Sequence, residues 1–322
     1  MRTVEKAQLW RGVWLLAVVV SLWGCSNGQG AADQGAVEQG AIDQGAIDQS
    51  VTDQGPIIAD SEESSLDPSV LAQRSAADNE SVLSAIAPSQ VVYLAETHND
   101  LADHEAQLSI IQTLSEQGDI AIGLEMFQRP FQSALDDYLA GGSEAELIAA
   151  SEYETRWGFD WELYAPILRY AKENSIPLIA LNTPAEITRK VAQTGLDSLE
   201  GDDLRYIPPV ADIDLSDADY RAWLSEIFNA HGGAGHSLDF ENFFAAQVLW
   251  DETMAERIVQ QLEAQPDTQV VVLVGEGHVL DDYGIPDRVE RRFPDVSQSS
   301  VRLTPSEQTT PPDAIDFVWI TD

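Results

Sequence analysis

Basic residues are scarce in this chain, and lysine is the scarcest of them. The 322 residues include 17 Lys and Arg against 55 Asp and Glu, so the formal net charge is −38; only Lys6, Lys172 and Lys190 are lysines. This balance argues against a nucleic-acid partner, because binding phosphates requires clustered basic side chains. Proteins in high salt tolerate such a self-repelling acidic surface, since dissolved ions screen it. We interpret the charge as an adaptation to habitat and solubility, with a cation-binding surface as the alternative.

The apolar run Val13–Val20 near the start is too short to span a bilayer comfortably. Basic residues precede it, and the small residue Gly24 and the single cysteine of the chain, Cys25, follow it. This order resembles a bacterial lipoprotein signal peptide, which would cover residues 1–25 and lead to lipidation of Cys25. Trp23 is bulkier than the residue expected at its position, so a plain secretory signal or an uncleaved anchor is the alternative.

Lipidation of Cys25 would leave no thiol for a disulfide and would attach the chain to a membrane. Ser26 follows the cysteine where an aspartate would retain the protein at the inner membrane. We therefore expect a lipid-anchored protein of the bacterial cell envelope, in the outer membrane and facing the periplasm. Its only contact with lipid would be the anchor.

Residues 31–55 repeat a five-residue unit of the type Ala-Ile-Asp-Gln-Gly. A glycine or serine in every unit opposes a continuous helix, and one branched apolar residue per unit cannot build a core. Solenoid repeats are longer or more apolar. The pattern predicts a flexible acidic linker over residues 26–80. About 40 residues of such a chain would have a root-mean-square end-to-end distance of roughly 35 Å.

Four short apolar segments each lead directly into polar residues of catalytic or ligand-binding type. Helical patterns separate these segments; for example, Leu108, Ile111 and Leu114 recur at helical spacing, and Ser143 with Glu146 forms a capping box. Strands that alternate with helices predict an α/β fold with a mainly parallel sheet flanked by helices, over residues 81–322. The four expected strands are Val91–Ala95, Ile120–Leu124, Pro177–Leu181 and Val270–Val274.

Residues from about 200 to 265 contain no convincing strand. The patterns predict a helix from Asp217 to Asn229, a glycine-rich loop, and a long helix from about Glu241 to Ala264. This region is expected to form an inserted all-helical subdomain that lies over the sheet. Two further segments, Ser300–Leu303 and Ile315–Ile320, are expected to add edge strands.

Polar side chains at the carboxyl ends of the strands form the candidate site. Glu96 and His98 follow the first strand, Glu125 the second, Asn182 the third and His278 the fourth. Ligands bind beyond the carboxyl ends of the strands in open parallel sheets, so these groups are expected to share one pocket. Two imidazoles and two carboxylates suit a divalent ion such as Mn, Fe, Co or Zn, or general acid–base chemistry without a metal.

Each of these residues also has a purely structural interpretation. Glu96 could cap a helix, Glu125 could pair with Arg129, and His278 could bond to backbone in its loop. Taken singly, these interpretations are the more common ones for such residue types. Taken together they are not, because all the residues must then fall by chance at the same end of one sheet.

Seven short motifs stand out along the folded part of the chain, at residues 93–99, 104–107, 123–127, 180–184, 246–255, 275–279 and 283–286. In their type and order they resemble the ChaN-like haem-binding lipoprotein family over about residues 88–295. Ala95 replaces the glycine expected before Glu96. The resemblance implies an α/β domain with a helical subdomain that binds haem, in bacterial iron uptake or storage, with a possible homodimer enclosing paired haems.

The family resemblance implies a tyrosine ligand for the haem iron, assisted by histidine. Tyrosinate suits ferric haem. Tyr283 is the first candidate and Tyr164 the second. No Cys-x-x-Cys-His motif is present, so covalent haem attachment is excluded. The histidines expected to contact haem are His104, His231, His236 and His278.

The wider superfamily also includes Tiki-type metalloproteases and erythromycin-esterase-like hydrolases, whose Glu-x-His and Gly-x-x-His motifs build their active sites. By that resemblance Glu96, His98, Glu125 and His278 would hold a metal such as Mn or Co and hydrolyse a peptide or ester. Haem binding is the preferred prediction, and a metal-dependent hydrolase is the alternative. A third possibility is an envelope scaffold with a vestigial pocket.

Overall fold

The computed structural model describes residues 78–230, 239–305 and 315–321. The predicted signal peptide with Cys25, most of the predicted linker, and the loop histidines His231 and His236 therefore lie outside the described residues. Residues 78–86 form a helix, so the folded region begins before residue 81. In the described ranges, no helix is long and apolar enough to cross a membrane.

The centre of the fold is a six-stranded sheet with the order β3-β2-β4-β1-β5-β6, in which every neighbouring pair is parallel. This confirms the predicted α/β class. The strands are built from short runs of branched apolar residues that are buried on both faces, as parallel strands between helical layers must be. Their bounds are β1 Val91–Glu96, β2 Ile120–Gln128, β3 Leu178–Asn182, β4 Gln269–Gly275, β5 Gln298–Thr304 and β6 Phe317–Ile320.

The prediction that the last two strands both lie at the edge is wrong for the first of them. β5 lies between β1 and β6, so only β6 and β3 are edge strands. The physical reason is that β5 pairs with β1, which is more than 200 residues earlier in the chain. A pairing over that separation leaves no local signal in the sequence.

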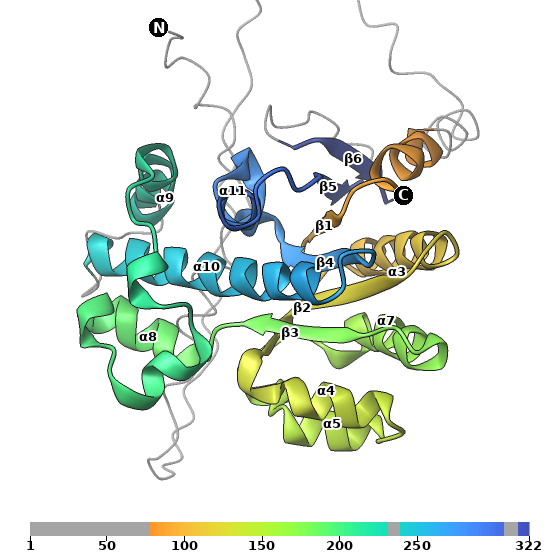
Figure 1. Cartoon of the computed structure of the whole chain (residues 1–322), viewed down its shortest axis with the longest axis horizontal. Helices are drawn as coiled ribbons and strands as arrows, with labels where there is room; N and C mark the ends of the chain where they lie inside the picture. The colour runs from red at the N-terminus through yellow and green to blue at the C-terminus, as the bar shows by residue number, and fades with distance from the viewer. Residues whose placement is uncertain (1–77, 231–238, 306–314, 322) are drawn as a thin grey trace, which may run out of the picture.

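Helices cover both faces of the sheet, and alternate residues of each strand enter the two layers (Figure 1). Val92 and Leu94 pack with one set of helices, whereas Val91 and Tyr93 pack against the other. The first set comprises α3 Leu101–Ser115, α4 Gln132–Leu139, α5 Glu144–Ala150, α6 Tyr153–Arg156 and α7 Trp161–Asn174; the second comprises α10 Phe240–Ala264 and α11 Ile285–Arg292.

The expected helical subdomain shares α10 with the layer that covers the sheet, so this helix belongs to two cores. Its first half packs with α8 Ala185–Thr194 and α9 Ala218–Ala230, while its second half covers the sheet (Figure 1). Between α8 and α9 the chain forms only short 3-10 turns, and the described part of residues 200–265 contains no strand. One continuous helix thus connects the subdomain to the end of the sheet where the candidate residues lie.

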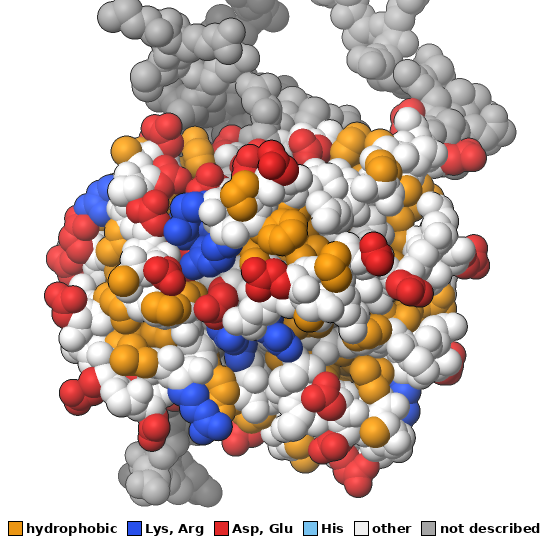
Figure 2. Space-filling model, in the orientation of Figure 1, with side chains coloured by type: hydrophobic (Ala, Val, Ile, Leu, Met, Phe, Trp, Pro, Cys, Tyr) orange, Lys and Arg blue, Asp and Glu red, His pale blue; other side chains and the backbone are white. Residues whose placement is uncertain are grey.

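The surface reflects the composition. Figure 2 shows acidic side chains scattered over the visible face and basic side chains in fewer, smaller groups.

Candidate functional site

Three neighbouring strands bring the predicted residues together. Glu96 is the last residue of β1, Glu125 lies near the end of β2, and His278 is in the 3-10 turn η6 (Glu276–His278) directly after β4. β4 lies between β2 and β1, so the three carboxyl ends are adjacent. All three side chains are buried, and the expected convergence at one edge of the sheet is confirmed.

Glu96 is the centre of a hydrogen-bond network. Its Oε1 lies 2.8 Å from Nδ1 of His98 and accepts a 2.5 Å hydrogen bond from the hydroxyl of Tyr164. Its Oε2 accepts a 2.6 Å hydrogen bond from the amide of Gln107, and Nδ1 of His104 is 3.7 Å from the same oxygen. Both carboxylate oxygens are therefore occupied by protein partners, and Glu96 orients His98.

His278 has a carboxylate on each side of its ring. Nδ1 lies 2.6 Å from Oδ1 of Asp251, and Nε2 lies 3.5 Å from Oε1 of Glu125. The second oxygen of Asp251 accepts a 2.6 Å hydrogen bond from the hydroxyl of Tyr220. Asp251 is fully buried in α10, so this helix supplies the carboxylate that fixes the ring of His278.

Gly275 connects the two networks. Its backbone N–H donates a 2.7 Å hydrogen bond to Oε2 of Glu125. A Cβ at this position would lie only 2.9 Å from Cε1 and Nε2 of His98. The ring of His98 is thus pressed against the end of β4, and only glycine leaves it that space.

The charges of the cluster stabilise one another. Burial by itself lowers the pKa of His278, but the carboxylates of Asp251 and Glu125 outweigh it and raise that pKa to about 10. Burial likewise opposes protonation of His98, yet Glu125 and Glu96 raise the pKa of its ring. Burial favours a neutral Glu125, but the two imidazoles lower the pKa of that carboxyl. The site favours charged imidazoles between carboxylates and so can give or accept protons.

Two further predicted residues have structural partners. The amide of Asn182 donates a 2.7 Å hydrogen bond to the backbone oxygen of Glu125, which places it at the same edge of the sheet. Arg129 forms its ion pair with Glu256 at 2.6 Å, so pairing with Arg129 is not the role of Glu125.

The predicted haem contacts are dispersed. Tyr164 and His104 are buried beside Glu96; Nε2 of His104 lies 3.1 Å from the backbone oxygen of His98, and its Nδ1 lies 3.0 Å from Oε1 of Gln107. These groups are positioned to support the dyad of Glu96 and His98. A haem iron could reach them only after these hydrogen bonds break.

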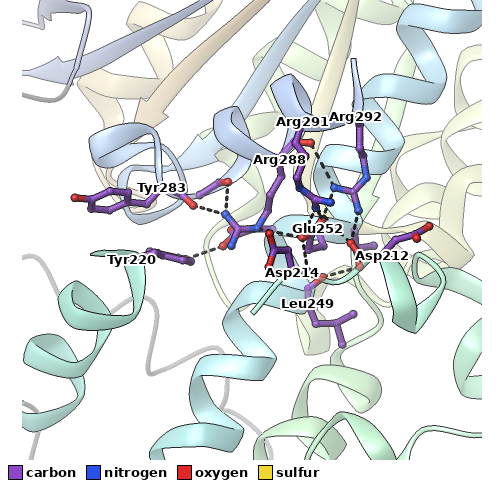
Figure 3. Close-up of polar contacts among 12 residues, drawn as sticks. Asp212, Asp214, Tyr220, Leu249, Glu252, Tyr283, Arg288, Arg291 and Arg292 are labelled. Atoms are coloured by element: carbon purple, nitrogen blue, oxygen red, sulfur yellow. Dashed lines mark hydrogen bonds and ion pairs between the residues drawn. The ribbon is translucent and has the colours of Figure 1, made fainter. Parts of the chain in front are cut away.

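Tyr283 packs with the core that α8, α9 and the first half of α10 share, and its ring is 6.0 Å from that of Tyr220 in α9. Figure 3 shows its side chain pointing away from Glu252, around which the guanidinium groups of Arg288, Arg291 and Arg292 gather. Glu252 is fully buried and joins α11 to α10. Within the described ranges, no side chain bonds to the hydroxyl of Tyr283.

A narrow cleft opens beside the histidines. The ring of Trp157 lies 4.9 Å from that of His98, and the ring of Trp250 lies 4.9 Å from that of His278, so each wall of the cleft touches one imidazole. The volume accessible to a water molecule is about 30 Å³. The lining residues are Met126, Gln128, Arg156, Trp157, Asn182, Thr183, Ala185, Thr188 and Trp250.

A metal centre is not formed as the side chains stand. No group of three or more His, Cys, Asp and Glu among residues 78–230, 239–305 and 315–321 is arranged to hold an ion. Residues that sequence reasoning did not single out include Asp251, Tyr220 and Gln107, which orient the predicted histidines and Glu96. Asp251 and Gln107 lie within motifs that resemble the family, and this resemblance is the feature of the sequence that could have identified them.

Comparisons with known proteins agree with this fold. The family model described as "Haem-binding uptake, Tiki superfamily, ChaN" matches residues 82–289, which include every described site residue. The chain is similar to the structure of ChaN of Campylobacter jejuni with cofacially bound haem, with a TM-score of 0.56 and 18% identity, covering 70% of this chain and 85% of that one.

Two further similarities were found. A mutant of the erythromycin esterase EreC in its open conformation has a TM-score of 0.43 and 16% identity, covering 70% of this chain and 72% of that chain. The protein RETICULATA-RELATED 5, chloroplastic, of Arabidopsis thaliana is 27% identical over 276 residues, which cover 79% of this chain and 37% of that protein. The chain thus spans well under half the length of this plant relative. The match over residues 82–289 shows that the chain belongs to the ChaN family of haem-binding uptake proteins in the Tiki superfamily.

Proposed function

We propose that this protein binds haem in the bacterial cell envelope, in haem and iron uptake or storage. One observation carries the proposal: the haem-binding family matches the whole region that holds the Glu96, Glu125 and His278 cluster. The ChaN structure from Campylobacter jejuni supports the fold.

The shape of the described region favours an open binding face. A drug-sized ligand usually occupies a pocket of roughly 300–1,000 Å³. The cleft beside the histidines has a volume of about 30 Å³. A second cavity, of about 230 Å³, lies at the amino ends of the strands, far from the candidate site, and is lined by residues such as Ser89, Gly118 and Gln269. A porphyrin would therefore lie against the surface, where a second copy of the chain could cover it as a homodimer.

Tyr283 fits the role of axial ligand better than Tyr164 does. Its ring is only partly buried, and its hydroxyl has no partner in the described segments, whereas the hydroxyl of Tyr164 is bonded to Glu96. Haem would supply a ferric iron that prefers a tyrosinate oxygen. Partial burial and the nearby Asp281 and Asp219 raise the pKa of Tyr283, so the iron must displace a firmly held proton.

The anchoring part of the proposal rests on the sequence around Cys25. Lipidation there, followed by the acidic linker, would keep the domain clear of the membrane surface, in the outer membrane and facing the periplasm. Membrane fractionation of cells that produce the wild type and Cys25→Ser tests this directly. Equal recovery of both proteins with the membranes would contradict the lipid anchor.

Titration of the full chain with hemin tests the haem proposal. We expect a saturable change with a ferric tyrosinate-like spectrum, which Tyr283→Phe shifts and Tyr164→Phe leaves in place. A shift confined to Tyr164→Phe would move the ligand to the buried cluster. A wild-type protein that shows only weak, nonspecific changes would end the haem proposal.

A metal-dependent hydrolase is the second candidate, and one observation favours it. Nδ1 of His98 and Nδ1 of His278 each lie against a carboxylate, at 2.8 Å from Glu96 and 2.6 Å from Asp251. Proteins orient metal-ligating and proton-transferring imidazoles in this way. Mn or Co would activate water when bound; His98, Glu125 and His278 would have to rearrange to hold the ion, with Glu96 and Asp251 positioning the rings.

Peptidase and esterase assays with added Mn or Co test this candidate. His278→Ala should abolish any metal-dependent turnover, while circular dichroism shows whether the variant is folded. Turnover that persists in His278→Ala would remove His278 from the mechanism. Wild-type protein that shows neither turnover nor haem binding would favour a scaffold with a vestigial pocket.

A further inference from the structure

We propose that the cleft beside the two histidines is a subsite for a carboxylate group. Its lining comes from the ends of β2 and β3, from α6 and the residue after it, and from α8 and α10, so it opens at the same end of the strands as Glu125 and His278. The identification of that carboxylate as a haem propionate rests on the proposed function; the subsite itself does not.

The first argument is that residues lining the cleft have buried polar atoms without partners. The hydroxyl of Thr183 and the indole N–H groups of Trp157 and Trp250 are buried and have no hydrogen-bond partner in the described part of the chain. Thr183 is 1% exposed and Trp250 is 5% exposed, and both residues line the cleft. A buried donor left unbonded destabilises the unliganded protein, so a ligand that accepts these hydrogen bonds is favoured on binding.

The second argument is the charge of the lining. The chain has 55 acidic residues, yet the lining contains none, and its single charged residue is Arg156. An indole N–H can only donate, and a hydroxyl can donate to an anion. Donors without competing carboxylates select an acceptor, and a carboxylate has two oxygens that can each accept from such donors.

The rim supplies a cation, Arg156, whose ion-pair partners are exposed. Arg156 donates a 2.9 Å hydrogen bond to Oε1 of Gln128, which also lines the cleft. Its two ion-pair partners, Glu152 and Glu186, have side chains that are 54% and 58% exposed. Exposed carboxylates exchange readily with solvent, so Arg156 can turn toward an incoming carboxylate at small cost.

The size of the cleft agrees with this ligand group. A volume of about 30 Å³ accommodates about two or three water-sized atoms and not a ring system. A carboxylate at the end of a flexible chain fits, while the rest of the ligand lies outside. A haem propionate has this form, and so does a small free carboxylic acid.

The test follows the indole N–H signals of the full chain by NMR during titration with propanoate. The Trp250 signal should move saturably. The Trp161 signal should stay, because its N–H already donates to Glu144 at 3.0 Å. Thr183→Val should weaken propanoate binding about tenfold. Thr253→Val is the matched control, since this buried hydroxyl bonds to the backbone oxygen of Leu249 at 2.8 Å and lies outside the cleft.

Hemin and its dimethyl ester identify the source of the carboxylate. If hemin moves the Trp250 signal and the ester does not, the cleft takes a haem propionate. If propanoate binds but hemin does not bind at all, the subsite stands for a free carboxylate and the proposed haem function fails. The carboxylate subsite is overturned if propanoate does not shift the Trp250 signal and if hemin and its ester shift that signal equally or not at all. The cleft then holds only water.

Discussion

Replacing Gly275 by alanine adds one methyl group against the ring of His98. The new Cβ would lie 2.9 Å from both Cε1 and Nε2 of that ring, closer than real Cβ contacts allow. The backbone at Gly275 has φ −62° and ψ 143°, which alanine adopts without strain, so the effect is purely steric. His98 cannot yield easily, because it is bonded to Glu96 and packed between Trp157 and Phe159.

The expected loss of unfolding free energy is about 1–3 kcal/mol, the usual cost of overpacking a buried site. Two glycines serve as matched controls. A Cβ at Gly123 also meets a side-chain atom at 2.9 Å, but that atom is the flexible end of Leu181, so Gly123→Ala should cost less. A Cβ at Gly118 meets nothing within 4 Å, so Gly118→Ala should stay within about 0.5 kcal/mol of wild type.

Urea unfolding measures the three variants, and NMR of the imidazole nitrogens reports on His98. Gly275→Ala should be the least stable variant and should shift the His98 signals. Wild-type stability together with unmoved His98 signals would show that this ring does not lie against the end of β4, and the geometry of the site would be wrong.

Substitutions at three further buried carboxylates, Asp251, Glu252 and Asp103, test the charges of the structure. Asp251→Asn should lower the free energy of unfolding in urea by about 3–5 kcal/mol, because it leaves the imidazolium of His278 without its carboxylate. Tyr220→Phe removes only one hydrogen bond to Asp251 and should lower it by about 1–3 kcal/mol. A larger loss for Tyr220→Phe than for Asp251→Asn would contradict the ion pair between Asp251 and His278. Glu252→Gln should cost about 3–5 kcal/mol by thermal or urea unfolding and more than Arg291→Ala, since Glu252 is fully buried and faces three guanidinium groups. Burial raises the pKa of Asp103 from 3.8 to about 7, so the contribution of Asp103 to the free energy of unfolding falls as the pH rises from about 4 to 7. Asp103→Asn should therefore become more stable relative to wild type between about pH 5 and pH 8. A stability difference between the two proteins that does not change with pH would contradict the raised pKa.

Local patterns predicted much of the fold. The apolar runs predicted β1 to β4, and the capping box of Ser143 and Glu146 is present as expected at the start of α5. The α9 and α10 helices also match their predicted ranges to within a few residues. These features depend on neighbouring residues alone, which is why the sequence was sufficient for them.

The position of β5 and the role of Asp251 needed the structure. β5 is an inner strand because of its pairing with β1, which no local pattern encodes. Asp251 lies in the middle of a long helix, where an acidic residue usually faces solvent; its burial follows from the way α10 passes over the end of β4. By contrast, convergence of Glu96, Glu125 and His278 could be predicted, because the carboxyl ends of neighbouring parallel strands share one edge.

The most direct test of the central claim asks whether ferric haem binds at this edge of the sheet. Paramagnetic iron broadens nearby NMR signals, and the indole N–H groups of Trp157, Trp250 and Trp319 serve as position markers. Trp157 and Trp250 line the cleft, whereas Trp319 lies in β6, four strands from β2 and thus about 19 Å away by strand spacing. Binding at the cleft predicts that one equivalent of hemin broadens the Trp157 and Trp250 signals and spares that of Trp319. Equal broadening of all three, or of Trp319 first, would contradict it.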